Sequence, residues 1–318
     1  MMTTYYENTS LAKINEAFYA SWDATLREVL QETKDVYAGH VEVDQMEGEF
    51  KAYRWIGKID LVEQRVRGED VPAEDPEFPT RWVYSRKFYK RVLFDTFDEI
   101  AMNISAQSPF MKAMAKGVVR LKNDVIHGAF FADVVGGKNR TNTYSLKADT
   151  FSITGGGRYI PHDTTNSFAK GGTSSGLTTE KLILARQALT TMHNDPNQVF
   201  NLVCSPKQVS DLLREAKEKE HSLQMISDMK TGEMFTYLGF NFLIDHNVSL
   251  EVKGDLDKDK DIYRCVAFPN DAVLYVSNPK PIFRVDFNTD KAMWQILVAA
   301  YMGAIRTDES KVVVIECA

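Results

Sequence analysis

The sequence predicts an α+β fold in which helices come early in the chain and strands accumulate near its end. Helical periodicity is clearest before residue 136, whereas six strand-like runs crowd the chain after residue 234. A stretch rich in glycine, serine and threonine, from Gly155 to Gly176, indicates a boundary between two subdomains. Regular alternation of strands and helices would have indicated a doubly wound parallel sheet, so this order favours α+β.

Composition places the chain among globular proteins. It has 318 residues, of which 44% are hydrophobic and 26% charged, enough for about two domains. The formal net charge of −6 argues against nucleic-acid binding through overall electrostatic attraction to phosphates. The first residues lack the pattern of a signal peptide, and the longest apolar run, Trp294 to Ile305, is about half the ~20 residues needed to span a bilayer. We therefore expect a cytoplasmic protein without a membrane segment.

The N-terminal region predicts an amphipathic helix that starts at Ser10 as its N-cap. Its apolar residues recur at steps of three and four and form one stripe: Leu11, Ile14, Phe18, Trp22, Leu26 and Val29. This stripe needs cover from a later part of the chain or from another subunit.

A long hairpin is expected next, with strands at Phe50 to Ile59 and Arg81 to Val92 and an irregular tip between them. The tip is acidic, with Glu69, Asp70, Glu74, Asp75 and Glu77, whereas the returning strand is basic, with Arg81, Arg86, Lys87, Lys90 and Arg91. Cations interleaved with aromatic residues also suit a single-stranded nucleic-acid platform. Opposite charges at the two ends of one hairpin favour head-to-tail contact between identical copies instead.

Two helices should follow the hairpin, a short one from Asp95 to Ser105 and a long one that begins at Ser108 and Pro109. The long helix keeps one apolar face, with Met111, Met114, Val118, Leu121, Val125 and Ala132, until Gly136 and Gly137 end it. Its length of roughly 40 Å, at ~1.5 Å per residue, indicates a structural spine.

The second half of the chain predicts a helix capped by Thr178 or Thr179, a strand from Val199 to Cys204, and a helix started by Ser205 and Pro206. Six strands are then expected: Phe235 to Ile244, Ile262 to Phe268, Ala272 to Ser277, Ile282 to Phe287, Met293 to Ile305, and Lys311 to Glu316. Cys204, Cys265 and Cys317 lie in apolar runs typical of buried free thiols.

No motif predicts catalysis or a cofactor. The aspartates at 255, 257, 259 and 261 alternate like calcium ligands, but Lys260 and Val266 stand where the loop needs Gly and Glu. The glycines at 155 to 157 lack the lysine of a phosphate loop, and His162, His193 and His246 lack zinc spacing. We expect no enzyme, no cofactor and no metal, and a soluble hydrolase with an unrecognised site remains as an alternative.

The C-terminal sequence AFPNDAVLYVSNPKPIFRVDFN, followed by KAMWQILVAAYMGAIRTDESKVVVIEC, resembles the end of the major capsid proteins of tailed bacteriophages. The order of elements also resembles their Hong Kong ninety-seven type fold. The resemblance implies an N-terminal arm at 1–40, an E-loop hairpin at 41–92, a P-domain with the spine helix at 93–176 completed by 289–318, and an A-domain at 177–288.

The resemblance also implies a function. It predicts a virion protein that self-assembles into pentamers and hexamers of an icosahedral head around double-stranded DNA, in the host cytoplasm. Its implied partners are further copies of itself, a separate scaffolding protein, a portal protein, a decoration protein and DNA held by weak non-specific contact. An encapsulin-like nanocompartment shell, which has the same fold, is the main alternative.

The residues singled out are for assembly, and none is catalytic, cofactor-binding or metal-binding. They are Phe18 and Trp22 on the arm, Glu74 and Asp75 at the hairpin tip, and Arg86 and Lys87 at its base. We expect the acidic tip of one copy to meet the basic strand of the next.

Overall fold

The computed structural model describes residues 35–57, 59, 78–95, 107–146, 158–163, 175–193, 198–218, 236–245, 262–277, 282–289 and 293–318. The chain divides into two compact units. Unit 1 comprises Met1–Asp35, Arg86–Lys122 and Asn278–Met302, and unit 2 comprises Val36–Ser85, Asn123–Ser277 and Gly303–Ala318. Outside the described residues lie the expected N-terminal helix, the hairpin tip, the helix expected after Asp95, most of the glycine-rich stretch and the aspartate run.

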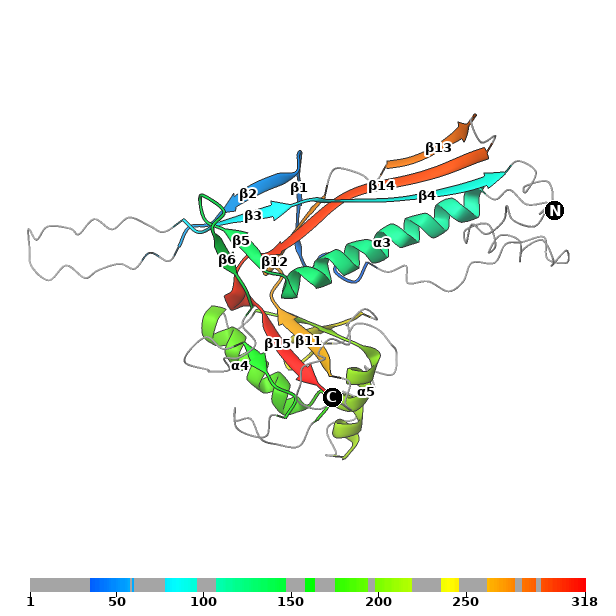
Figure 1. Ribbon diagram of the computed structural model, residues 1–318. Helices are drawn as coiled ribbons and strands as arrows, with labels where there is room; N and C mark the ends of the chain where they lie inside the picture. The colour runs from blue at the N-terminus through cyan, green and yellow to red at the C-terminus, as the bar shows by residue number, and fades with distance from the viewer. Residues whose placement is uncertain are drawn as a thin grey trace, which may run out of the picture. The chain divides into compact units, whose positions relative to one another are not determined.

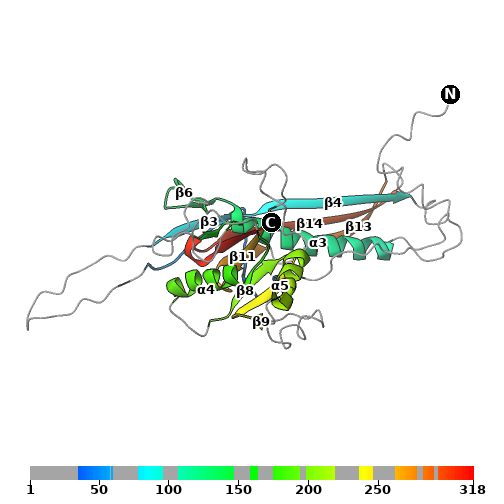
Figure 2. The same ribbon diagram turned by 90° about the horizontal axis from the view of Figure 1, so that it is seen from below.

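The described residues of unit 1 form three antiparallel strands and one helix. Strand β14 (Met293–Arg306) lies between β4 (Arg86–Asp95) and β13 (Ile282–Asn288), so that β13 forms an edge. Helix α3 (Gln107–Phe131) runs along the strands, as Figures 1 and 2 show. Both α3 and β14 continue into unit 2, α3 after Lys122 and β14 after Met302.

The two faces of the unit 1 sheet differ because side chains alternate along each strand. On β14, the residues Ile296, Val298 and Ala300 are buried, with exposures of 0%, 5% and 5%. Val298 and Ala300 line a pocket with α3, so this face points toward the helix. The alternate residues, such as Leu297 and Ala299, are only half-buried on the opposite face.

Unit 2 contains a mixed six-stranded sheet whose strand order is β7-β15-β11-β8-β10-β9. The strands are β7 (Tyr159–Ile160), β8 (Phe200–Cys204), β9 (Thr236–Tyr237), β10 (Phe240–Ile244), β11 (Tyr263–Phe268) and β15 (Val313–Cys317). The helices α4 (Thr179–His193) and α5 (Pro206–Glu218) join one core cluster with the sheet, in which Leu182, Leu189 and Leu212 are fully buried. Figure 2 shows both helices beside β8.

The end of α3 packs on the same sheet through residues outside that cluster. The rings of Phe130 on α3 and Phe268 on β11 have centroids 4.7 Å apart, and both side chains are fully buried. Phe268 follows Ala267, which belongs to the cluster with α4 and α5, so alternation places Phe268 on the opposite face. The sheet of unit 2 is therefore covered on both faces.

Two smaller strand groups complete unit 2. A four-stranded sheet has the order β2-β3-β5-β6, formed by β2 (Phe50–Arg54), β3 (Thr80–Tyr84), β5 (Val134–Gly136) and β6 (Asn142–Tyr144). Strand β1 (Glu42–Gln45) pairs in parallel with β12 (Val273–Ser277), and β12 is the neighbour of β14 in a five-stranded sheet that also contains β13 and β4. A short 3-10 helix, η1 (Glu309–Lys311), precedes β15 and is capped by the Asp308 side chain.

Three expectations about element boundaries were wrong. The returning hairpin strand is two strands, because β3 ends at Tyr84 in the sheet with β2 while β4 starts at Arg86 against β14. Helix α3 ends at Phe131 rather than at Gly136, since Val134–Gly136 pairs with β6. The run from Phe235 to Ile244 is a tight hairpin rather than one strand, with positive φ angles at Leu238 (51°) and Gly239 (79°).

Other expectations are confirmed. The predicted cap of α4 is present, since the backbone N–H of Lys181 donates to Thr178 Oγ1 over 3.4 Å. Ser205 and Pro206 start α5, and the Gln208 side chain accepts the Ser205 N–H over 3.0 Å, as in a capping box. The α+β class is also confirmed, and the division into four named domains stays a prediction.

Candidate interaction surfaces

The open face of unit 1, which we define as the sheet face opposite α3, combines cations with apolar side chains. Register places Ala299 between Tyr89 and Ile282, and Leu297 between Arg91 and Arg284. Tyr89 is 80% exposed and Ile282 48% exposed. Lys87 lies over the ring of Tyr301, with its Nζ 5.7 Å from the ring centroid. Such a mixed surface is typical of protein contacts, in which aromatic residues and arginine are enriched.

The predicted assembly residues Arg86 and Lys87 are exposed at the start of β4. They belong to unit 1, opposite Met302 and Tyr301 of β14, rather than to the strand that pairs with β2. Phe18, Trp22, Glu74 and Asp75 lie outside the described residues. The structure therefore shows two of the six predicted residues, and it places those two beside each other on one strand.

The hairpin surface of unit 2 is formed by the exposed aromatic side chains of β2 and β3. Phe50 and Tyr84 are 47% and 42% exposed, with ring centroids 6.5 Å apart. The guanidinium of Arg140 lies over Phe50 and Trp82, at 4.1 and 4.3 Å from the ring centroids. Stacking of this kind stabilises the cation and holds the rings in place.

An ion pair joins β1 to β2 beside this hairpin. Asp44 accepts hydrogen bonds from Lys51 Nζ and Tyr53 OH, each over 2.6 Å. These two donors, Lys51 first, lower the pKa of Asp44 to about 2. The group is well exposed, so the pair fixes geometry more than it stabilises the fold.

Two buried arginines, Arg81 and Arg306, anchor the base of the hairpin, and neither was predicted to be buried. Arg81 on β3 is 5% exposed and forms a two-pronged ion pair with Glu309, with distances of 2.7 and 2.6 Å. Arg306 is fully buried and donates to the carbonyls of Phe130 over 2.6 Å and Tyr144 over 3.3 Å. Arg306 thereby caps the C-terminus of α3. The only sequence signal for Arg306 is its position directly after the apolar run that ends at Ile305.

Lys181 is a second buried cation of unit 2. Its Nζ lies 2.8 to 3.2 Å from the backbone carbonyl oxygens of His162, Ser175, Gly176 and Glu316, which share its three N–H donors. The side chain is fully buried, and desolvation lowers its pKa. Lys181 therefore connects His162 and Ser175, on either side of residues 164–174, to Glu316 of strand β15.

A buried polar cluster links three distant segments of unit 2. The hydroxyl of Tyr37 donates to Asp245 Oδ2 over 2.9 Å and lies 3.2 Å from His127 Nδ1. The exposures of Tyr37, His127 and Asp245 are 0%, 6% and 0%. Desolvation lowers the pKa of His127, although the carboxylate of Asp245 opposes it. All three side chains of the cluster are therefore shielded from solvent.

The three thiols of the chain lie together on neighbouring strands β8, β11 and β15. Cys204, Cys265 and Cys317 are free and fully buried, which confirms the expectation from sequence. Burial raises the pKa of the Cys204 thiol, so it stays protonated and unreactive. Within the described ranges, no three His, Cys, Asp or Glu side chains are placed to hold a metal ion.

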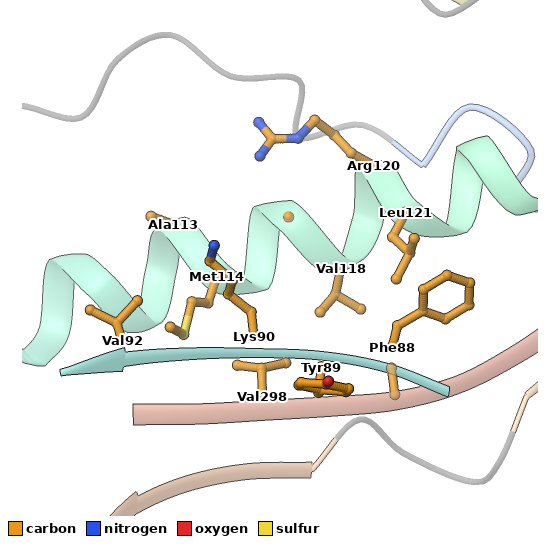
Figure 3. Close-up of a pocket in the computed structure, with 12 residues that line it drawn as sticks. Phe88, Tyr89, Lys90, Val92, Ala113, Met114, Val118, Arg120, Leu121 and Val298 are labelled. Carbon is orange, nitrogen blue, oxygen red and sulfur yellow. The ribbon is translucent and has the colours of Figure 1, made fainter. Parts of the chain in front are cut away.

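A pocket of about 490 Å³ lies in unit 1 between α3 and the sheet. Figure 3 shows Met114, Val118 and Leu121 reaching from α3 toward β4 and β14, with Phe88 and Val298 on the strand side. Lys90 and Arg120 supply cations to its lining. The lining is mostly apolar and holds no carboxylate, histidine, cysteine or serine, so the pocket suits an apolar side chain rather than catalysis.

Solved structures of similar fold are phage capsids. They include the capsid asymmetric unit of Cyanophage Pam1, with TM-score 0.67, 11% identity, and coverage of 93% of this chain and 95% of that chain. The capsid of Ralstonia phage GP4 matches with TM-score 0.66, 12% identity, and coverage of 93% and 94%. A structure from Mycobacterium phage Che8 matches with TM-score 0.60, 16% identity, and coverage of 92% and 95%. The fold is the Hong Kong ninety-seven capsid type.

The sequence itself matches a protein family over nearly its whole length. The profile of a family described as phage capsid protein aligns with residues 14–318. The chain therefore belongs to the phage capsid protein family and is a structural component of the virion. Comparison with curated protein sequences found no match. No helix in the described part of the chain is long and apolar enough to cross a membrane.

Proposed function

We propose that this chain is the major capsid protein of a tailed phage, which self-assembles into pentamers and hexamers of an icosahedral head around double-stranded DNA. The family match over residues 14–318 carries the proposal. The capsid fold, shared with structures that cover 92 to 93% of the chain, supports it. The role is mechanical, and we propose that the chain has no enzymatic activity.

The exposed surfaces support assembly from identical copies. The open face of unit 1 carries Tyr89, 80% exposed, and the hairpin region of unit 2 carries Ile56 and Phe78, 69% and 58% exposed. A monomer leaves such side chains in water, which soluble proteins keep to small patches. Closed symmetry lets each copy bury these surfaces against its neighbours.

The proposed contact between copies is electrostatic in part. The exposed cations Arg86 and Lys87 lie on β4, and the acidic residues Glu74 and Asp75 belong to the hairpin tip in the sequence. We propose that the tip of one copy meets β4 of the next, because complementary charges set orientation and register.

Further partners follow from the same role. We propose a separate scaffolding protein, a portal protein and a decoration protein, with assembly in the host cytoplasm. Contact with the packaged DNA is weak and non-specific, since a net charge of −6 gives the wall little attraction for phosphates.

Electron microscopy of the purified chain, alone and with the products of its neighbouring genes, tests the proposal. Shells, tubes or rings of capsomers support it, and DNA inside native particles supports a phage head. Particles filled with an enzyme cargo instead would establish the nanocompartment alternative. A monomer under every condition would contradict both shell functions.

A double substitution tests the charged contact. Arg86→Glu with Lys87→Glu should abolish shell formation while the thermal unfolding temperature stays unchanged, since both side chains are exposed. The control is Lys138→Glu with Arg214→Glu, which makes the same charge change at two exposed cations of unit 2. Normal shells from the first variant would refute the contact.

A further inference from the structure

The pocket of unit 1 marks an incomplete core. Met114, Val118 and Leu121 line it from α3 and remain half-buried, although they form the apolar face of the helix. Farther along the same helix, Ile126 and Phe130 are fully buried. An apolar helix face that is only half-buried lacks some of the side chains that would pack against it.

Gly117 leaves room for a packing partner close to the helix backbone. It lies inside α3, where glycine costs about 1 kcal/mol relative to alanine, and it lines the pocket. A Cβ atom at this position would meet only the far end of the Arg120 side chain, at 3.8 Å. A segment that lies in the pocket can therefore come close to the helix backbone at Gly117.

The chain itself supplies a candidate segment next to the pocket. Asp35 forms an ion pair with Lys122 of α3, the residue after Leu121 at one end of the pocket. The first 34 residues of the N-terminal arm therefore join the described structure beside the pocket. A segment attached at this point has a high effective concentration for the pocket.

The predicted helix of the arm fits the pocket in length. The stripe from Phe18 to Val29 spans about 17 Å at ~1.5 Å per residue, and α3 from Ala113 to Leu121 spans about 12 Å. The residues between Val29 and Asp35 reach up to about 20 Å when extended. The stripe can therefore lie along the pocket while Asp35 stays bound to Lys122.

Charge is complementary as well. The part of α3 in unit 1 carries Lys112, Lys116, Arg120 and Lys122 and no acidic residue. Residues 10–29 carry three acids (Glu16, Asp23 and Glu28) against two bases (Lys13 and Arg27), and Glu32, Lys34 and Asp35 follow them. The pair between Asp35 and Lys122 is an example of this attraction.

We propose that residues 10–29 dock as a helix in the unit 1 pocket of the same chain, with the apolar stripe against α3 and the strands. This places the cover for Phe18 and Trp22 in their own chain rather than in a neighbouring subunit. The docked helix completes the core of unit 1. The proposal concerns the single chain and does not depend on the capsid function.

Cross-linking of paired cysteines tests the docking in the full chain. Leu26→Cys is combined with Val118→Cys, which lines the pocket, or with Ala115→Cys, which is exposed on α3 and does not line it. A short bismaleimide should link the first pair within one chain at least 10-fold faster than the control pair. The native thiols do not interfere because all three are fully buried.

The products distinguish the possible occupants. A cross-link that leaves the monomer mass on a denaturing gel, at submicromolar protein, supports docking within the chain. Cross-linked dimers would overturn it in favour of another copy's arm. Equal or absent cross-linking of both pairs would overturn it in favour of a different occupant. None of these products requires a shell, so failure here and failure of the proposed function are separable.

Filling the pocket gives an independent measurement. Gly117→Leu places a side chain in the pocket, whereas Gly128→Leu makes the same change on α3 at an exposed site with nothing within 4 Å. We expect Gly117→Leu to raise the rate of tryptic cleavage after Arg27 about 10-fold, while Gly128→Leu leaves it unchanged. Equal cleavage of both variants would overturn the docking.

Discussion

The two parts of α3 share one helical backbone but have different surroundings. In unit 2, Ile126 and Phe130 are fully buried against a sheet that has helices on both faces. In unit 1, Met111 is 37% exposed and Val118 borders a pocket of about 490 Å³. The difference teaches that unit 2 has a complete core, whereas unit 1 depends on further segments or copies to bury its apolar surfaces.

The largest expected decrease in the free energy of unfolding follows from removal of Arg306, the buried arginine of unit 2. Arg306→Ala leaves the carbonyls of Phe130 and Tyr144 without their donor and should lower the free energy of unfolding by about 3–5 kcal/mol. Chemical denaturation measures this. The control is Arg91→Ala on the open face of unit 1, where we expect a change within about 0.5 kcal/mol. Similar losses at both positions would contradict the comparison.

A Leu to Ala substitution made once in each unit compares how completely the two cores are packed. Leu189→Ala on α4 removes a fully buried side chain and should cost about 2–5 kcal/mol. Leu121→Ala on α3 removes a half-buried side chain that lines the pocket, and should cost at least about 1 kcal/mol less. Equal costs in urea denaturation would show that the core of unit 1 is as complete as that of unit 2.

Acid should weaken unit 2 through His127. Burial lowers its pKa below the value of 6.5 for the unfolded chain, so the unfolded state binds more protons as the pH falls through that value. The free energy of unfolding should therefore decrease as the pH falls below about 6.5, and His127→Gln should reduce this slope. His40→Gln, at a partly exposed histidine, is the control. An unchanged slope in His127→Gln would exclude this residue as the cause.

The smallest effect is expected at the exposed rim of unit 2. The pKa of Asp44 falls from 3.8 to about 2, so its contribution to stability is complete above pH 3.8 and is lost as the pH falls toward 2. Asp44→Asn should lower the thermal unfolding temperature only slightly, because Asp44 and Lys51 are both well exposed. A titration of the Asp44 carboxyl by NMR that gave a midpoint near 4 would contradict the pairing with Lys51 and Tyr53.

Local signals explain what could be predicted from the sequence. The cap residues Thr178 and Ser205 and the periodicity of Leu182 and Leu189 are encoded within a few residues, and the structure confirms those helices. Strand β14 was predicted within one residue at its end because its apolar run is long. Each of these features depends on neighbours in sequence.

Features that depend on distant pairing were missed. The break at Ser85 arises because β3 and β4 join different sheets, and no residue type at that position signals it. The strand was expected to end at Ile305, so a role for Arg306 was not predicted, and its acceptors on α3 and β6 lie more than 160 residues earlier in the chain. The pocket needs α3, β4 and β14 together, so no single segment could indicate it.

The burial of all three thiols makes the chain a convenient substrate for site-directed chemistry. Cys204, Cys265 and Cys317 are inaccessible in the folded state, so a cysteine introduced on the surface is the only thiol that a maleimide dye or peptide reaches. Reaction of the native thiols then requires opening of the unit 2 sheet, and its rate reports that opening. The same chain can therefore carry a surface label while the reaction rate of its buried thiols measures how often the unit 2 sheet opens. No native cysteine has to be removed.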